Sequence, residues 1–86
     1  MKSYQAWSDD ADVMVGTFEA MSTGSALQKA HTRDSGDEAY NGNTANYRVS
    51  ADGGKTWTAH RVRAEMVPEW SINGGASCDA PEADDE

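Results

Sequence analysis

Four neighbouring residues carry the side chains best suited to acid–base chemistry: His60, Arg61, Arg63 and Glu65. Enzymes that cleave by acid–base catalysis combine a histidine, a carboxylate and an arginine on one surface. In an extended strand, however, successive side chains point to opposite faces, so His60 would lie away from the other three. We therefore predict a solvated, self-neutralising row of charges, no catalytic residue, and a protein that is not an enzyme.

No metal or cofactor site is predicted from the remaining residues. The two histidines, His31 and His60, and the single cysteine, Cys78, lack the paired spacing of zinc modules. The run Asp10-Ala11-Asp12 begins like a calcium-binding loop, but Met14 stands at the next ligand position and the required glycine is missing. The glycine patterns of phosphate-binding loops are not found either. We expect Cys78 to be incidental, since no basic neighbour activates it.

Acidic residues form two short clusters that offer a different kind of chemistry. They are Asp9, Asp10 and Asp12 in the first cluster, and Asp34, Asp37 and Glu38 in the second. Arginine forks bind carboxylates much as they bind phosphates, so a carboxylate surface can occupy a site meant for nucleic acid. We predict that these six residues bind a partner. The alternative is a solvated surface that only confers solubility.

The negative net charge of the sequence favours a basic partner. The net charge is −8, and residues 73–86 contain five acids and no base. Such a surface disfavours direct binding to nucleic acid or to anionic membranes, and it favours basic protein surfaces. One cysteine permits no intramolecular disulfide, and the first residues contain no apolar run of the secretory type. We therefore expect a cytoplasmic protein.

One motif is sharply defined, and it spans residues 50–57. Its sequence, SADGGKTW, matches the pattern S-x-D-x-G-x-T-W at Ser50, Asp52, Gly54, Thr56 and Trp57. The aspartate can accept hydrogen bonds from backbone N–H groups of a turn, and glycine supplies a positive φ. The segment resembles the Asp-box of sialidases, other β-propellers and some microbial ribonucleases. This implies a structural hairpin rather than an activity. A propeller is excluded because each blade needs about 40–50 residues.

The elements that position these residues are predicted from turn signals and periodicity. Residues 4–7 and 13–20 read as a hairpin around a polar turn, with one face of the second strand formed by Met14, Gly16, Phe18 and Ala20. A helix follows, capped by Ser25 with Gln28, or by Ser22 or Thr23. Residues 34–46 read as a loop. Residues 47–50 and 56–65 read as a second hairpin.

The predicted fold class is α+β. It consists of one small antiparallel sheet in the order β-β-α-β-β with one helix packed on one face. Residues 66–72 are a fifth strand in an alternative form of this prediction, confined to an edge by Pro68. Residues 1–72 would form a single domain. Residues 73–86 would be a disordered acidic tail.

The layout resembles small acidic proteins of phages and mobile elements, including anti-CRISPR and other anti-defence inhibitors. The likeness rests on the Tyr4-x-x-Trp7 opening, the Asp-rich turn, the alanine-bearing helix, the hairpin, and the closing Val67-Pro68-Glu69-Trp70 stretch. It implies an inhibitor that occupies the nucleic-acid-binding surface of another protein, and it assigns no site residue. Two alternatives remain: an assembly protein binding through an aromatic patch of Trp7, Trp57 and Trp70, and a small ribonuclease-type enzyme using His60.

Overall fold

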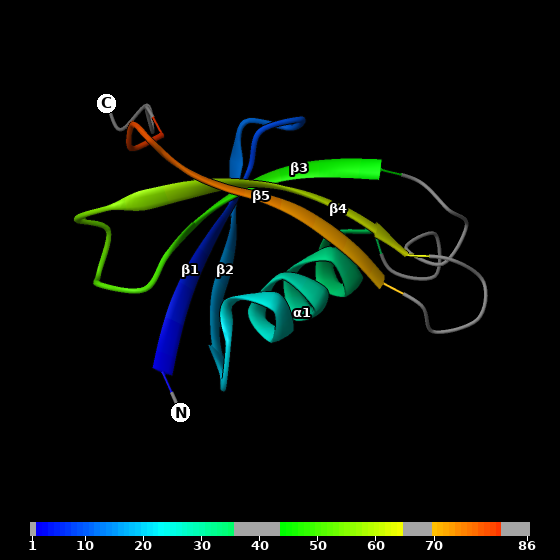
Figure 1. Ribbon diagram of the computed structural model, residues 1–86, viewed down its shortest axis with the longest axis horizontal. Helices are drawn as coiled ribbons and strands as arrows, with labels where there is room; N and C mark the ends of the chain where they lie inside the picture. Colours follow the sequence, from blue (N-terminus) through cyan, green and yellow to red (C-terminus); the bar gives the residue numbers. More distant parts are fainter. Residues whose placement is uncertain (1, 36–43, 65–69, 82–86) are drawn as a thin grey trace.

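The computed structural model describes residues 2–35, 44–64 and 70–81. Its elements are β1 (Lys2–Ser8), β2 (Val13–Ala20), α1 (Thr23–Ser35), β3 (Thr44–Ser50), β4 (Trp57–Ala64) and β5 (Trp70–Cys78). The strands form one antiparallel sheet in the order β2-β1-β3-β4-β5. Figure 1 shows this twisted sheet with α1 against one of its faces.

The sheet is assembled from two groups of strands that are each contiguous in sequence. β1 and β2 form a hairpin, and β3, β4 and β5 form a meander. The two groups meet only where β1 pairs with β3, through four residue pairs from Gln5↔Ser50 to Ser8↔Tyr47. The seam is therefore short compared with the ladders inside each group.

The core lies between α1 and the face of the sheet that α1 covers, called here the helix face. From α1 it receives Ala26, Leu27 and Ala30, and from the strands Tyr4, Ala6, Ala20, Ala45, Tyr47, Val49 and Val62. Alanines on both sides let the helix approach the strands closely, and Tyr47 is the largest fully buried side chain. The cap of α1 is Ser22, whose hydroxyl accepts a hydrogen bond from the Ser25 N–H at 3.2 Å.

The predicted α+β class is wrong, because strands make up 58% of the described residues and only one helix accompanies them. The protein is a mostly β fold. The predicted order β-β-α-β-β is confirmed, and a fifth strand, as in the alternative form of the prediction, completes the sheet. One amphipathic helix is enough to cover the apolar face of the sheet, because the sheet is strongly twisted.

The last strand differs most from its prediction. β5 spans Trp70–Cys78, so the expected boundary after residue 72 falls inside a strand, and residues 73–78 are not disordered. The sequence Asn73-Gly74-Gly75 resembles a turn, yet it forms a bulge in the pairing with β4 between Ala59 and His60. Gly74 has φ +108°, which a residue with a side chain rarely adopts. Two glycines thus let the strand continue where a turn was expected.

A second bulge changes the direction of Met14. Ala6 pairs with Gly16 and Trp7 pairs with Met14, so Val15 is the extra residue of β2. Because Trp7 and Ala6 point to opposite faces of β1, Met14 lies on the opposite face from Gly16. The prediction that Met14 shares a face with Gly16, Phe18 and Ala20 is therefore wrong. Its side chain is 46% exposed.

Candidate functional site

The Asp-box hairpin forms the hydrogen bonds that its sequence predicts. The Asp52 carboxylate accepts from the Thr56 hydroxyl at 2.6 Å, from the Thr56 N–H at 3.0 Å and from the Ser50 hydroxyl at 2.8 Å. These donors, the Thr56 hydroxyl above all, hold the pKa of Asp52 far below its ordinary value. The Ser50 oxygen in turn accepts from the Gly54 N–H at 2.8 Å. These polar atoms form their hydrogen bonds within the turn, so this motif is a structural element.

The three tryptophans do not form an exposed aromatic patch. Trp57 is 5% exposed, and its indole N–H donates to the Gly54 carbonyl at 3.0 Å. Trp7 is 6% exposed, and Trp70 is half-buried against the ring of His31, with 5.9 Å between ring centroids. An assembly protein binding through these indoles therefore has no surface of that kind to use. The indoles stabilise the fold instead.

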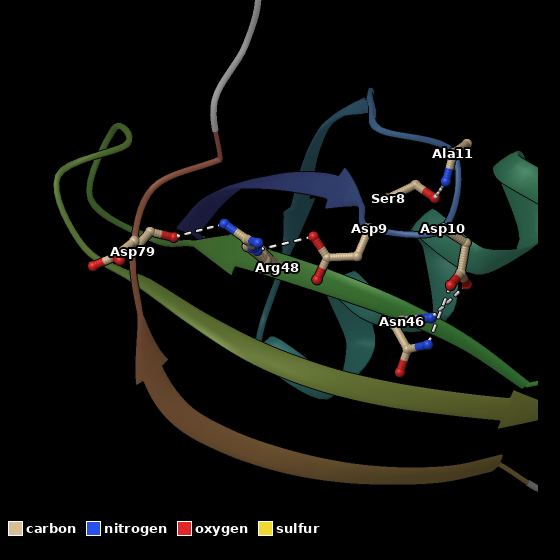
Figure 2. A network of polar contacts seen from close by, with 7 residues as sticks. All are labelled: Ser8, Asp9, Asp10, Ala11, Asn46, Arg48 and Asp79. Carbon is tan, nitrogen blue, oxygen red and sulfur yellow. Dashed lines mark hydrogen bonds and ion pairs between the residues drawn. The ribbon is translucent and has the colours of Figure 1, made fainter.

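The acidic turn, residues 9–12, is fastened to β3 on the face that α1 does not cover, called here the open face. Figure 2 shows Asp9 beside Arg48, with 2.9 Å between the carboxylate and Nε. Both oxygens of Asp10 accept from Asn46, from its N–H at 2.9 Å and from its side-chain amide at 3.2 Å. The Asp9 N–H donates to the Asn46 carbonyl at 2.9 Å. Asp9 and Asp10 therefore organise the turn through contacts within the protein itself.

The end of the acidic turn is exposed to solvent, and no hydrogen bond or ion pair of the Asp12 carboxylate is found among the described residues. The Ser8 hydroxyl accepts from the Ala11 N–H at 3.2 Å and closes the turn. Asp12 then adopts a left-handed conformation with φ 57°, and its side chain is exposed. Val13 and Met14 follow, 48% and 46% exposed. Asp12, Val13 and Met14 together are called the hairpin tip below.

Of the second acidic cluster, the structure describes only Asp34. Its carboxylate accepts a hydrogen bond from the Tyr47 hydroxyl at 3.0 Å. Because side chains alternate along β3, Tyr47 points to the helix face, whereas Asn46 and Arg48 point to the open face. Among the described acids, Asp34 is thus held on the opposite face of β3 from Asp9 and Asp10. Asp37 and Glu38 lie outside the described residues.

Sequence reasoning missed a buried polar chain that links α1 to β3. The His31 Nδ1 lies 2.8 Å from the Tyr47 oxygen, and His31 is fully buried. Since the Tyr47 hydroxyl proton goes to Asp34, we assign the histidine proton to Nδ1, which donates to the Tyr47 oxygen. The spacing of Leu27 and His31 on one helical face is the signal that could have revealed it.

The side chains of His31, Tyr47 and Asp34 are of the types found in acid–base sites, but His31 is buried and not accessible from solvent. Among the described residues, Nε2 of His31 is buried without a hydrogen-bond partner. Burial lowers the pKa of His31, and the negative charge of Asp34 opposes this only in part. Because the second nitrogen of His31 is buried, the geometry favours a structural role in which the hydrogen bonds among His31, Tyr47 and Asp34 hold α1 on the sheet.

A pH dependence of stability follows from the lowered pKa of His31. The unfolded chain binds a proton near pH 6.5 and the folded chain only at lower pH, so the free energy of unfolding should fall as the pH is lowered from 7 through 6.5. Burial lowers the pKa of His60 as well. Urea unfolding at pH 7 and pH 5 should therefore show a smaller loss in His31→Asn than in the wild type, because the amide keeps a donor for Tyr47 without titrating.

His60→Gln is the corresponding test for the second histidine, because the glutamine amide can replace Nε2 in its 2.7 Å contact with the Thr58 hydroxyl. We expect each substitution to remove part of the pH dependence, and the double substitution to remove more than either. If the loss of stability between pH 7 and pH 5 were the same in His31→Asn as in the wild type, the buried neutral histidine would be the wrong explanation.

The side chains of the segment from His60 to Arg63 point to alternate faces of the sheet, as the sequence predicts. His60 pairs with Tyr47 and so faces the helix, while Arg61 and Arg63 face the opposite side. Glu65 lies outside the described residues. The structure thus does not bring the histidine and the two arginines together on one surface.

Within residues 2–35, 44–64 and 70–81, no cluster of histidine, cysteine or carboxylate side chains has the arrangement of a metal site. In the same part of the chain, no helix has the length and apolar character needed to cross a membrane. Comparison with protein-family models, with curated proteins and with solved structures found no match to this chain.

Proposed function

We propose that this protein is a non-catalytic binding module that docks on a basic surface of a partner protein through the hairpin tip. The observation that carries the proposal is the exposure of Val13 and Met14, 48% and 46%, directly after the acidic turn. Large apolar side chains beside charge are the composition of a protein interface, in which methionine is enriched. The net charge of −8 selects basic partners.

The geometry of the hairpin supports this role in two ways. The bulge at Val15 directs Met14 outward, and bulges commonly re-aim a side chain at a binding edge. The bonds from Asp9 and Asp10 to β3 also fix the tip in one conformation. A surface that is ordered before binding loses less conformational entropy on association, which raises affinity.

The specific form of the proposal is an inhibitor, of the anti-CRISPR or anti-defence type, that occupies a nucleic-acid-binding surface of its partner in the cytoplasm. Asp12 supplies the carboxylate that would replace a phosphate against lysine or arginine. Asp9, Asp10 and Asp34 act indirectly, because their carboxylates are already bonded within the protein. No cofactor enters this proposal.

The test is capture of partners from bacterial lysate by the full chain and by Asp12→Asn/Met14→Ser. Asparagine tolerates the left-handed conformation of Asp12, so the fold is retained while one charge is removed. We expect the variant to lose the partner, and the wild type to release it at high salt, because salt screens exposed charges beyond about 8–10 Å.

The matched control is Glu19→Gln/Met21→Ser, which makes the same chemical changes at exposed positions at the far end of the hairpin. It should capture the partner as the wild type does. A captured nucleic-acid-handling protein should then be displaced from its nucleic acid by the wild-type chain. Equal capture by the two double variants, or a partner that binds this chain and nucleic acid together, would contradict the proposal.

A further inference from the structure

The open face of the sheet contains a shallow hollow, open to solvent, that the proposed interface does not use. It has a volume of about 670 Å³ and is lined by Asp9, Asn46, Ala59, His60, Arg61, Asn73 and Gly74. Asn46, Arg61 and Asn73 are direct cross-strand neighbours on β3, β4 and β5, so their side chains form one row across the sheet. Ala59 lies next to this row on β4. The volume suits a small ligand.

Arg61 is aligned by the acidic turn. Its Nε donates to the Asn46 side-chain oxygen at 3.4 Å, and the Asn46 side-chain nitrogen donates to Asp10 at 3.2 Å. Figure 2 shows the Asn46 amide held by Asp10 at the end of the turn. The guanidinium is thus oriented by a neutral amide and not by a carboxylate. Among the described residues, the two terminal nitrogens of Arg61 and the side chain of Asn73 have no hydrogen-bond partner.

The neighbouring arginine is not available in the same way. Arg48 is occupied by the Asp9 carboxylate at 2.9 Å and by the Asp79 carbonyl at 3.0 Å. One oxygen of Asp9 remains at the rim of the hollow as an acceptor. The hollow therefore presents a guanidinium fork and an amide on one side, and a carboxylate on another.

We propose that this hollow binds a small carboxylate ligand whose other end carries hydrogen-bond donors, as in a hydroxy acid. The ligand carboxylate pairs with the free edge of Arg61, whose planar fork matches two carboxylate oxygens. Asn73 donates to the same group, and Asp9 accepts from the hydroxyl. A monoanion is favoured over phosphate because Asp9 and the net charge of −8 oppose a second negative charge.

The experiment is an NMR titration of the 15N-labelled full chain with sodium lactate, sodium acetate and sodium phosphate at constant ionic strength. Lactate should produce saturable shifts of the Arg61 Nε–H and Asn73 side-chain amide signals. Acetate, which lacks the hydroxyl, should bind more weakly, and phosphate most weakly. Phosphate binding more tightly than lactate, or shifts that never saturate, would overturn the proposal.

Substitutions of Arg61 distinguish paired hydrogen bonds of its guanidinium group from simple attraction between opposite charges. Arg61→Gln and Arg61→Lys should each lose about tenfold or more in lactate affinity, since each removes the paired charge-assisted hydrogen bonds. Arg33→Gln is the matched control, because Arg33 lies over the Phe18 ring on the helix face, and it should bind as the wild type does. Full affinity in Arg61→Lys, or an equal loss in Arg33→Gln, would overturn the site. The outcome is independent of the hairpin-tip interface, which shares none of these residues.

Discussion

Gly74→Ala should be among the most destabilising single substitutions in this chain, costing about 3–5 kcal/mol of unfolding free energy. A Cβ on Gly74 would lie 2.5 Å from the Ala59 carbonyl oxygen and 3.0 Å from the His60 Cα. Both are backbone atoms of the adjacent strand, so no side chain can move aside. The φ of +108° adds strain, because L residues rarely adopt it. Urea unfolding monitored by tryptophan fluorescence measures the effect.

Gly53→Ala separates the two causes. Gly53 has a comparable positive φ of +79°, but a Cβ there would meet no atom within 4 Å. Its substitution should cost only the conformational strain, about 1–2 kcal/mol. If the two variants were equally stable, the close approach of β5 to Ala59 would not be the reason for the glycine.

Leu27→Ala should reduce the unfolding free energy by about 3–4 kcal/mol. Leu27 is the only leucine in the sequence and is fully buried between α1 and the sheet. Its neighbours in the core are largely alanines and ring systems that cannot expand into the space left behind. In a chain of 86 residues this is a large share of the total stability. The urea midpoint should fall while the m-value stays constant.

Met21→Ala is the control for this truncation. Met21 is 83% exposed, so removing its side chain should change stability by no more than about 0.5 kcal/mol. A similar loss in both variants would mean that helix propensity or strand ends, rather than burial of Leu27, determine the stability. A changed m-value in Leu27→Ala would instead indicate a less compact native state.

The parts of the fold that sequence predicts are those set by local chemistry. The Asp-box is local because its donors and acceptors lie within residues 50–57, and the element order follows from turn residues and alternation. The helix cap is equally local, although the structure selects Ser22 from the three serines and threonines proposed. Such features need no knowledge of the rest of the chain.

The wrong predictions concern contacts between distant segments. The sequence Asn73-Gly74-Gly75 gives no local indication that this segment packs against Ala59. Because of that packing, a sequence typical of a turn forms part of a strand. Similarly, the bonds of Asp9 and Asp10 could not be predicted, because their partners Arg48 and Asn46 are remote in sequence; the prediction that these two acids take part in binding a partner stays a prediction. His31 could not be assigned before Tyr47 was placed beside it. Burial and pairing across the sheet decide these positions, and neither has a local signature.

From the short seam between β1 and β3 we expect a particular order of folding. The hairpin and the meander each consist of strands that are neighbours in sequence, so each requires only small loops to close. The seam joins residues 5–8 to residues 47–50, and its loop-closure entropy must be overcome before four residue pairs can form. We therefore expect docking of one group on the other to be the slow step. The helix, which contacts strands of both groups, completes its packing only at that step.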